Sequence, residues 1–498
     1  MKKTALFFLL FLHFYSQAQT IPTDNPLQSE LDQFVQKAAL LYMKDNGNTA
    51  LSIGIIKDNI AYTYNYGTTK YGEQILPTNH TAYEIGSISK TFAGTLVALA
   101  LKDKKINLKD DIRKYLDQKY PNLEYNGQPI RIEHLVSHTS GLPKFIPNID
   151  LNNKSEDSVI AQIIASSKNY STDVFLKDLH QIKINSLPGT QYNYSNAATE
   201  LMGIILEKVY HKSYTKLLKD YITVPLKMIN TEINPNRNNP NLIAGYNSNF
   251  KIMPPIPSNV IAAGGIYATT TDMLQYLKFH LNEKNDIAHL SHQVTWRDSE
   301  SFALGLYWRI NTTSEGVQKL SHSGGTFGYS SYGVIYPELN IGIIMLTNCS
   351  GASSQNDLEN TAEKIFNNLY YTPTELAAED FELPRNIKKL RIQLLQRGFN
   401  QAIAVAEDLN SQKNKLSEGE LNNWGYTLLR SNKKTEALEI FKLNVHLFPK
   451  SGNTYDSLAE TYENLKNKEL ALQNYKRSLE LDPANSNAVE RIKKLEQK

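Results

Sequence analysis

A repeat of 34 residues near the C-terminus is the feature that most restricts the fold of this chain. Six positions recur 34 residues later, with large apolar residues, small residues and a proline in corresponding places, and 449+34=483 gives the last pair. They are Trp424, Gly425, Leu428, Ala437, Phe441 and Pro449, which recur as Leu458, Ala459, Tyr462, Ala471, Tyr475 and Pro483. Small residues let paired helices touch, and a proline ends the second helix of a pair. The period therefore predicts an α-helical repeat region.

The pattern resembles the tetratricopeptide repeat, whose unit is a helical hairpin of this length. Asn444 and Ser478 stand where that repeat usually has alanine, and a weaker third unit surrounds Ala402 and Ala406. Such a tail has two interpretations, a helical cap on the preceding domain or a groove for a protein or peptide partner. Both are consistent with the sequence.

The segment before the repeat has mixed strand and helix patterns. Residues 52–67 alternate around Asp58-Asn59, which predicts a hairpin, and apolar runs within 316–349 predict further strands. A stretch with two prolines and clustered acids then separates this part from the tail. We therefore predict a first domain at 19–371, a linker at 372–389 and the helical repeats at 390–498.

The N-terminus has the pattern of an export signal. A basic start is followed by an apolar run of about 12 residues, shorter than the roughly 20 that span a bilayer as a helix. Ser16-Gln17-Ala18 then offers the small-x-small spacing of a cleavage site. We predict a signal peptide at 1–18 and an exported protein, periplasmic or secreted, with no integral membrane span after its removal. An uncleaved membrane anchor is the alternative.

Ser87 and Lys90 form the first chemical motif. Ser-x-x-Lys occurs four times in the chain, but only at Ser87 does a glycine precede a predicted helix start. Side chains three residues apart on a helix can touch, and the helix start stabilises an oxyanion. A partly desolvated lysine can take the hydroxyl proton. The pair is thus the minimum apparatus for an activated nucleophile.

Two further motifs follow in the chain. Tyr194 and Asn196 offer a phenol as a proton shuttle and an amide that orients the lysine or the substrate. His322 and Ser323 precede two glycines between strand-like runs, where a substrate could approach the strand closely.

These three motifs, in this order, resemble those of the penicillin-recognising serine hydrolases, which include serine β-lactamases, D-alanyl-D-alanine peptidases and related esterases. The Tyr-x-Asn motif is similar to that of the class C β-lactamase branch. Supporting stretches lie at 132–143 (IEHLVSHTSGLP), 262–272 (AAGGIYATTTD) and 305–308 (GLYW). The resemblance covers about 30–370 and implies an α+β fold, an antiparallel sheet flanked by helices with a helical subdomain at about 100–300.

The resemblance also implies roles for the motif residues. Ser87 would be the acylated nucleophile, Lys90 its proton partner and Tyr194 the general base or acid. Asn196, His322 and Ser323 would bind substrate, and the backbone N–H groups of Ser87 and Gly325 would form the oxyanion hole. The implied reaction forms an acyl-enzyme that water hydrolyses.

His322 departs from the β-lactamase pattern, which usually has lysine there to pair with the antibiotic carboxylate. Histidine is shorter and only partly charged at neutral pH. We therefore expect a D-amino-acid peptide or an ester as substrate rather than a β-lactam, with a class C β-lactamase as the alternative.

Other classes of function fit the sequence less well. The 53 Lys+Arg nearly balance 50 Asp+Glu, which argues against nucleic acid as a partner. His134 and His138 could form one edge of a metal site if helical, but neither the zincin glutamate nor a third ligand accompanies them, so we expect no metal and no cofactor. The rival from another class is a non-enzymatic binding protein that uses the hydrolase fold and the repeats as a scaffold.

Overall fold

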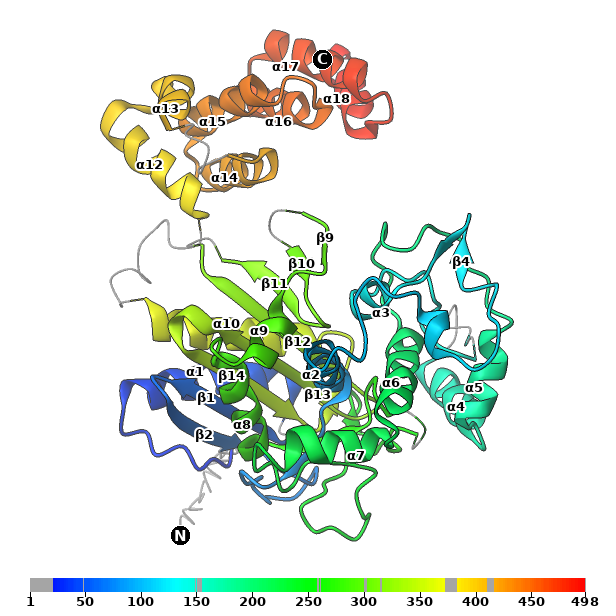
Figure 1. Ribbon diagram of the computed structural model, residues 1–498. Helices are drawn as coiled ribbons and strands as arrows, with labels where there is room; N and C mark the ends of the chain where they lie inside the picture. Colours follow the sequence, from blue (N-terminus) through cyan, green and yellow to red (C-terminus); the bar gives the residue numbers. More distant parts are fainter. Residues whose placement is uncertain are drawn as a thin grey trace, which may run out of the picture. The chain divides into compact units, whose positions relative to one another are not determined.

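The computed structural model describes residues 21–497 except 48, 148, 150–154, 258, 260, 300–301, 314–315, 372–382 and 410–415. The predicted signal peptide and most of the predicted linker lie outside the described residues. The chain divides into two compact units, the first up to Tyr371 without Thr313–Val317 and the second after Tyr371 with Thr313–Val317, and each is described by itself (Figure 1). Within the described ranges, no helix combines the length and the apolar character needed to cross a membrane.

An eight-stranded antiparallel sheet forms the centre of the first unit, with the order β2-β1-β14-β13-β12-β11-β10-β9. Its strands are β1 (Leu51–Lys57), β2 (Ile60–Tyr66), β9 (Trp296–Arg297), β10 (Phe302–Leu304), β11 (Arg309–Thr312), β12 (Gln318–Gly325), β13 (Ser330–Tyr336) and β14 (Ile341–Thr347). The predicted hairpin is β1–β2, and its turn residues Asp58 and Asn59 have φ of 52° and 67°. Two left-handed residues make the tight turn that matches strand twist. The hairpin belongs to the same sheet as the later strands, because β1 pairs with β14.

Helices cover both faces of this sheet (Figure 1). On one face, a Cβ added to Gly54 would lie 3.0 Å from Leu274 of α8 (Thr270–Leu281), and α2 (Ser89–Lys102) packs beside α8. The other face carries α10 (Ser354–Tyr370), whose Phe366 ring stacks on Tyr336 at 3.8 Å, and α1 (Glu30–Asn46) packs on α10. The predicted α+β class, with helices flanking an antiparallel sheet, is confirmed.

The remaining elements of the first unit are short strands and a set of helices between β2 and β9. The strands are β3 (Ala82–Glu84), β4 (Glu124–Tyr125), β5 (Gln128–Pro129), β6 (Glu232–Ile233), β7 (Tyr246–Asn247), β8 (Ile266–Thr269) and, after β14, β15 (Cys349–Ser350). The helices are α3 (Ile132–Val136), α4 (Glu156–Ser167), α5 (Thr172–Leu179), α6 (Asn196–Tyr210), α7 (Tyr214–Leu218) and α9 (Asp286–His292). Single turns lie at Gly86–Ile88, Ile112–Tyr115, Lys219–Thr223 and Pro337–Leu339.

The second unit is helical, as predicted. It contains α12 (Arg385–Arg397), a turn at Phe399–Gln401, α13 (Ala402–Leu409), α14 (Glu418–Arg430), α15 (Lys434–Leu447), α16 (Gly452–Asn464), α17 (Lys468–Leu481) and α18 (Ser486–Glu496). The α14–α15 pair begins 34 residues before the α16–α17 pair (418+34=452 and 434+34=468). The sequence period therefore corresponds to one helical hairpin.

Close packing inside the hairpins explains the small residues of the period. A Cβ added to Gly425 would lie 2.6 Å from the Phe441 ring, so a larger residue would separate α14 from α15. The two polar departures are buried: Asn444 donates to the Glu418 carbonyl at 3.2 Å while its Oδ1 has no partner among the described residues, and Ser478 accepts from Asn485 at 2.9 Å. A buried polar group with a partner costs little stability.

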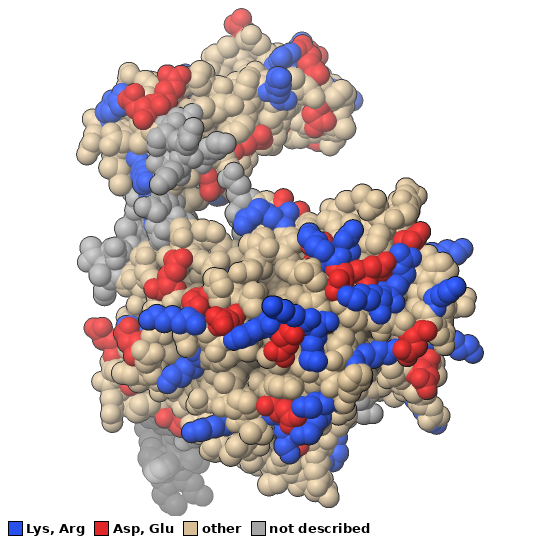
Figure 2. Space-filling model, viewed as in Figure 1, with Lys and Arg blue, Asp and Glu red and all other residues tan. Residues whose placement is uncertain are grey.

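Charges of both signs are interspersed on the face shown in Figure 2. Several form exposed ion pairs, such as Lys102 with Asp286 at 2.9 Å and Lys251 with Asp157 at 3.0 Å. Such exposed pairs add little stability each.

Candidate active site

Ser87 lies in a tight turn immediately before α2. The turn spans Gly86–Ile88, and the α-helix begins only at Ser89, two residues later than the sequence suggests. Between Thr81 and Ala98, Ser87 is the one residue that is not buried. The fold therefore presents this hydroxyl at the surface of an otherwise buried segment.

Lys90 and Tyr194 both contact the Ser87 hydroxyl. The Lys90 Nζ donates to Ser87 Oγ at 3.0 Å, and the Tyr194 hydroxyl donates to the same oxygen at 2.7 Å. The Lys90 amine lies 4.8 Å from the centre of the Tyr194 ring and also donates to the Ala263 carbonyl at 2.6 Å. Two segments 107 residues apart thus meet at one oxygen atom, and a third segment contacts the Lys90 amine.

Burial separates the proton affinities of the two groups. It lowers the pKa of Lys90 to about 7, although the Glu200 carboxylate opposes this shift, and it raises the pKa of Tyr194 to about 12. An amine with such a pKa is neutral in roughly half of the molecules near pH 7. Lys90 can therefore accept a proton, whereas Tyr194 is a neutral phenol that can donate one.

Glycines bring the turn before Ser87 against β12. A Cβ added to Gly324 would lie 2.1 Å from the Ile85 carbonyl oxygen, and one added to Gly86 would lie 2.7 Å from the Gly325 nitrogen. Gly325 also lines the same cavity as Ser87. The Gly325 nitrogen thus lies against the turn that carries Ser87, and the oxyanion hole formed by these two N–H groups stays a prediction.

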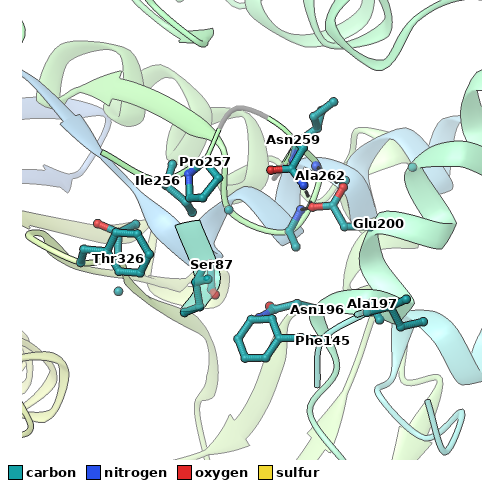
Figure 3. Close-up of a pocket in the computed structure, with 18 of the residues that line it drawn as sticks. Ser87, Phe145, Asn196, Ala197, Glu200, Ile256, Pro257, Asn259, Ala262 and Thr326 are labelled. Atoms are coloured by element: carbon teal, nitrogen blue, oxygen red, sulfur yellow. Dashed lines mark hydrogen bonds between the residues drawn. The ribbon is translucent and has the colours of Figure 1, made fainter. Parts of the chain in front are cut away.

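The cavity at Ser87 is large and mostly apolar. It has a volume of about 1000 Å³ and is lined in part by residues of α4, α5 and α6. Figure 3 shows Ser87, Asn196 and Glu200 around it. Its apolar walls include Phe145, Ile146, Ile163, Phe175, Ile204, Ile256, Pro257 and Ile261. Asn196, the first residue of α6, also lines it. The cavity has room for a peptide or another bulky acyl group.

His322 and Ser323 lie beside the site but do not line this cavity. Both are buried, His322 with 3% of its surface exposed and Ser323 with 8%. Burial, with the Arg309 and Lys90 charges, holds the pKa of His322 well below its usual range, and its Nδ1 lies 2.6 Å from the Ser323 carbonyl oxygen. His322 is therefore a neutral residue, in contrast to the partial charge expected from its type.

Three charged residues near the site were missed by the sequence motifs. Lys144 and Arg309 are cations that act on Tyr194, and Glu200 accepts bonds from a loop that contacts Lys90. Lys144 and Arg309 each follow directly after a supporting stretch, and Glu200 lies four residues after Asn196 on α6. The sequence could have indicated Glu200, because a residue four positions after Asn196 on the same helix lies on the same helix face.

The two histidines considered for a metal are separated by the end of a helix. His134 is in α3, which ends at Val136, and His138 has φ of 55° beyond it. The His134 Nδ1 accepts from the Arg131 N–H, and the His138 Nδ1 accepts from the Ser195 N–H. The described part of the chain holds no group of three potential metal ligands. His138 instead packs on the Tyr194 ring, 4.5 Å between centres.

The fold is that of the β-lactamases and D-alanyl-D-alanine peptidases. A family model described as Beta-lactamase matches residues 35–366, more than half of the chain, and the chain therefore belongs to this family. The match ends before the repeat region, so the tetratricopeptide identity of the tail stays a prediction.

Individual relatives are distant. The chain is 25% identical over 372 residues to "Protein flp" of Staphylococcus aureus (strain MRSA252), with 70% of this chain and 68% of that protein covered. It is 26% identical over 325 residues to the D-alanyl-D-alanine-carboxypeptidase/endopeptidase AmpH of Escherichia coli (strain K12), with 60% and 80% covered. A crystal structure of a beta-lactamase/D-alanine carboxypeptidase from Yersinia pestis, complexed with citrate, superposes with a TM-score of 0.56 at 23% identity. That match covers 68% of this chain and 99% of the other, and it shows the fold.

Proposed function

We propose that the protein is a serine hydrolase that forms an acyl-enzyme on Ser87. The observation that carries this proposal is the pair of contacts at Ser87 Oγ, 3.0 Å from the Lys90 amine and 2.7 Å from the Tyr194 hydroxyl, at the edge of a cavity. A nucleophile, a base and an acid within hydrogen-bond distance are the parts that acyl transfer needs.

The pKa values assign the proton steps. Neutral Lys90 takes the Ser87 proton as Oγ attacks the substrate carbonyl, and the N–H groups of Ser87 and Gly325 stabilise the oxyanion. When the bond to the leaving group breaks, Tyr194 protonates that group and Lys90 returns a proton to Tyr194. Water then attacks the ester by the reverse sequence, which releases the acid and restores Ser87.

A peptide that ends in a D-amino acid, or an ester, is the substrate class we favour. The relative AmpH carries carboxypeptidase and endopeptidase activities in its name. The positive charge of Arg309 acts on both Tyr194 and His322, and we infer that this cation binds a substrate carboxylate, the task that neutral His322 cannot perform. The same neutrality of His322 argues against efficient β-lactam turnover by a class C β-lactamase.

Covalent labelling separates this proposal from the scaffold alternative. A fluorophosphonate or a fluorescent penicillin should label the wild type, with the added mass on the peptide that contains Ser87, and should not label Ser87→Ala. Ser213→Ala is the matched control, because Ser213 also belongs to a Ser-x-x-Lys motif but is exposed at the start of α7. Equal labelling of wild type and Ser87→Ala, or none of either, would contradict an enzyme at this site.

A substrate panel then defines the reaction. It comprises peptides ending in D-Ala-D-Ala, short-chain p-nitrophenyl esters and nitrocefin, with Arg309→Ala tested beside the wild type. We expect turnover of a peptide or an ester, and a raised KM in Arg309→Ala only for substrates with a free carboxylate. A carboxylate-independent effect would show that Arg309 does not bind that group.

We also propose that the protein is exported and that its helical tail binds a protein or peptide partner. The signal pattern at 1–18 supports a periplasmic or secreted enzyme, and the 34-residue helical hairpins support a tetratricopeptide-like tail. N-terminal sequencing of the protein recovered from outside the cytoplasm tests the export signal. A mature chain that starts after Ala18 supports signal cleavage, and a chain that still begins at Met1 supports an uncleaved membrane anchor.

A further inference from the structure

Glu200 binds three consecutive backbone amides at the active-site cavity. It lies in the second turn of α6, and Figure 3 shows its carboxylate directed at Ala262. Its Oε1 accepts from the N–H groups of Ile261 at 3.1 Å and Ala263 at 2.9 Å, and its Oε2 accepts from Ala262 at 3.2 Å. Burial raises the pKa of Glu200, whereas the three N–H groups and the Lys90 charge favour its ionised form, in which these hydrogen bonds are strongest and tie the loop to α6.

Ala263 links this carboxylate to the Lys90 amine. Its N–H donates to Glu200, while its carbonyl oxygen accepts from Lys90 Nζ at 2.6 Å. Lys90 in turn donates to Ser87 Oγ. A chain of contacts therefore runs from Glu200 through one loop residue to the base and then to the hydroxyl.

The charge of Glu200 also acts on Lys90. Burial and the Lys144 cation both lower the pKa of Lys90, and the Glu200 carboxylate opposes them. The other titratable groups around the amine are Tyr194, in hydrogen bond with the same serine, and two buried histidines. The histidines are His138 and His322, whose pKa values burial holds well below the usual range, and Arg309 lies further out, next to Tyr194 and His322.

We propose that Glu200 is a positioning residue for acylation: by holding the loop at 261–263 it fixes the Ala263 carbonyl, and through it the Lys90 amine, against Ser87. The inference rests on the proposed roles of Ser87 and Lys90. Glu200 itself touches neither the nucleophile nor, in this mechanism, the reacting carbonyl.

The test is the pH dependence of fluorophosphonate labelling of the full chain between pH 5 and 9. The variants are Glu200→Gln, which removes the charge, and Glu200→Asp, which keeps it on a shorter arm. Asp272→Asn is the matched control, because Asp272 is a buried carboxylate that accepts from Asn230 N–H and the Thr231 hydroxyl, both at 2.8 Å, away from the cavity. Thermal unfolding of each variant reports whether it folds.

In Glu200→Gln we expect two changes. The plateau rate should fall about tenfold or more, because the loop and Lys90 lose their alignment. The pH midpoint should move about one unit toward acid, because an opposite charge has been removed from an amine. Glu200→Asp should keep the wild-type midpoint with a plateau reduced several-fold, and Asp272→Asn should keep both values.

Each remaining outcome decides the matter. If Glu200→Gln folds and has the pH midpoint and plateau labelling rate of the wild type, the positioning role is overturned. An equal loss of plateau rate in Asp272→Asn also overturns it. Should Glu200→Gln not fold, an unchanged plateau in Glu200→Asp overturns it instead. Labelling of Ser87→Ala at the wild-type rate would contradict the proposed function. If Ser87→Ala is not labelled while Glu200→Gln is labelled like the wild type, the proposed function stands and only the role of Glu200 is contradicted.

Discussion

Gly86 and Gly325 meet backbone to backbone. A Cβ on Gly86 would lie 2.7 Å from the Gly325 nitrogen, and Gly86 has a φ of 52°, in the region that favours glycine. Gly86 directly precedes Ser87, and Gly325 carries the second of the two N–H groups that we assign to the oxyanion. The turn before Ser87 is therefore shaped by contact with a strand more than two hundred residues away.

Gly86→Ala should abolish labelling of Ser87. The new methyl group must displace the Gly325 backbone, and with it one oxyanion donor; loss of one donor typically costs 10²–10³ in rate, so we expect a decrease of about a hundredfold or more. Gly72→Ala is the matched control, since Gly72 has a φ of 85° but meets nothing within 4 Å. That variant has the backbone strain alone, and comparable labelling in the two variants would show that the contact is unimportant.

The labelling rate of the wild type should rise with pH through about 7 and then stay level. Lys90 acts as a base only when neutral, and its pKa is about 7. Two pH units below that value the rate should be about a hundredfold lower than the plateau. Stopped-flow or gel-based labelling from pH 5 to 9 measures this, and a rate that is independent of pH would exclude neutral Lys90 as the base.

Lys90→Met should give a more stable but inactive protein. The folded pKa of Lys90 lies below its unfolded value of 10.5, so the unfolded chain binds more protons between about pH 7 and 10.5, and the wild type gains stability as pH rises through that window. Methionine removes the cost of burying the amine, on the order of a few kcal/mol near pH 7. We expect a Tm higher by a few degrees at pH 7, and a smaller difference at pH 9. An equal or lower Tm at pH 7 would show that the amine's hydrogen bonds outweigh its burial.

His322→Lys should not create a β-lactamase. The residue is buried near Lys90 and Arg309, so a lysine there would add a third positive charge in a place that already disfavours charge. We expect a lower Tm, slower labelling and nitrocefin hydrolysis no faster than in the wild type. A gain in nitrocefin turnover would mean that position 322 can reach the substrate.

Truncation after Tyr371 should leave labelling within about twofold of the full chain. The core of the first unit and the core of the helical tail are built from separate residues, the latter around Trp424, Phe441 and Tyr475. Circular dichroism and labelling of the truncated chain measure folding and activity. Retained folding with lost labelling would instead assign the tail a role in substrate access, and lost folding would make it a structural cap.

Patterns within short segments could be interpreted from the sequence. The Asp58-Asn59 turn, the alternating strands of the hairpin and the 34-residue period of the tail each depend on neighbours along the chain, and the structure has the predicted elements there. The motif spacing also selected Ser87, Lys90 and Tyr194 for their chemistry, although it suggested a helix start two residues too early.

Protonation and exposure could not be predicted in the same way. His322 is buried and neutral because of the helices and charges packed around its strand. Glu200 reaches the Lys90 site through a loop that lies 61 to 63 residues further along the chain. Neither fact follows from residue type.

The amino-acid sequence by itself determined the hairpin, the repeat period of the tail, the family and the motif residues Ser87, Lys90 and Tyr194, because those depend on local periodicity and on short motifs. Only the tertiary structure decided that a phenol 107 residues from Ser87 and a carbonyl 173 residues from Lys90 converge on one amine and one hydroxyl. The physical reason is that burial sets the pKa values of these groups, and burial is a property of the whole packed domain rather than of any segment.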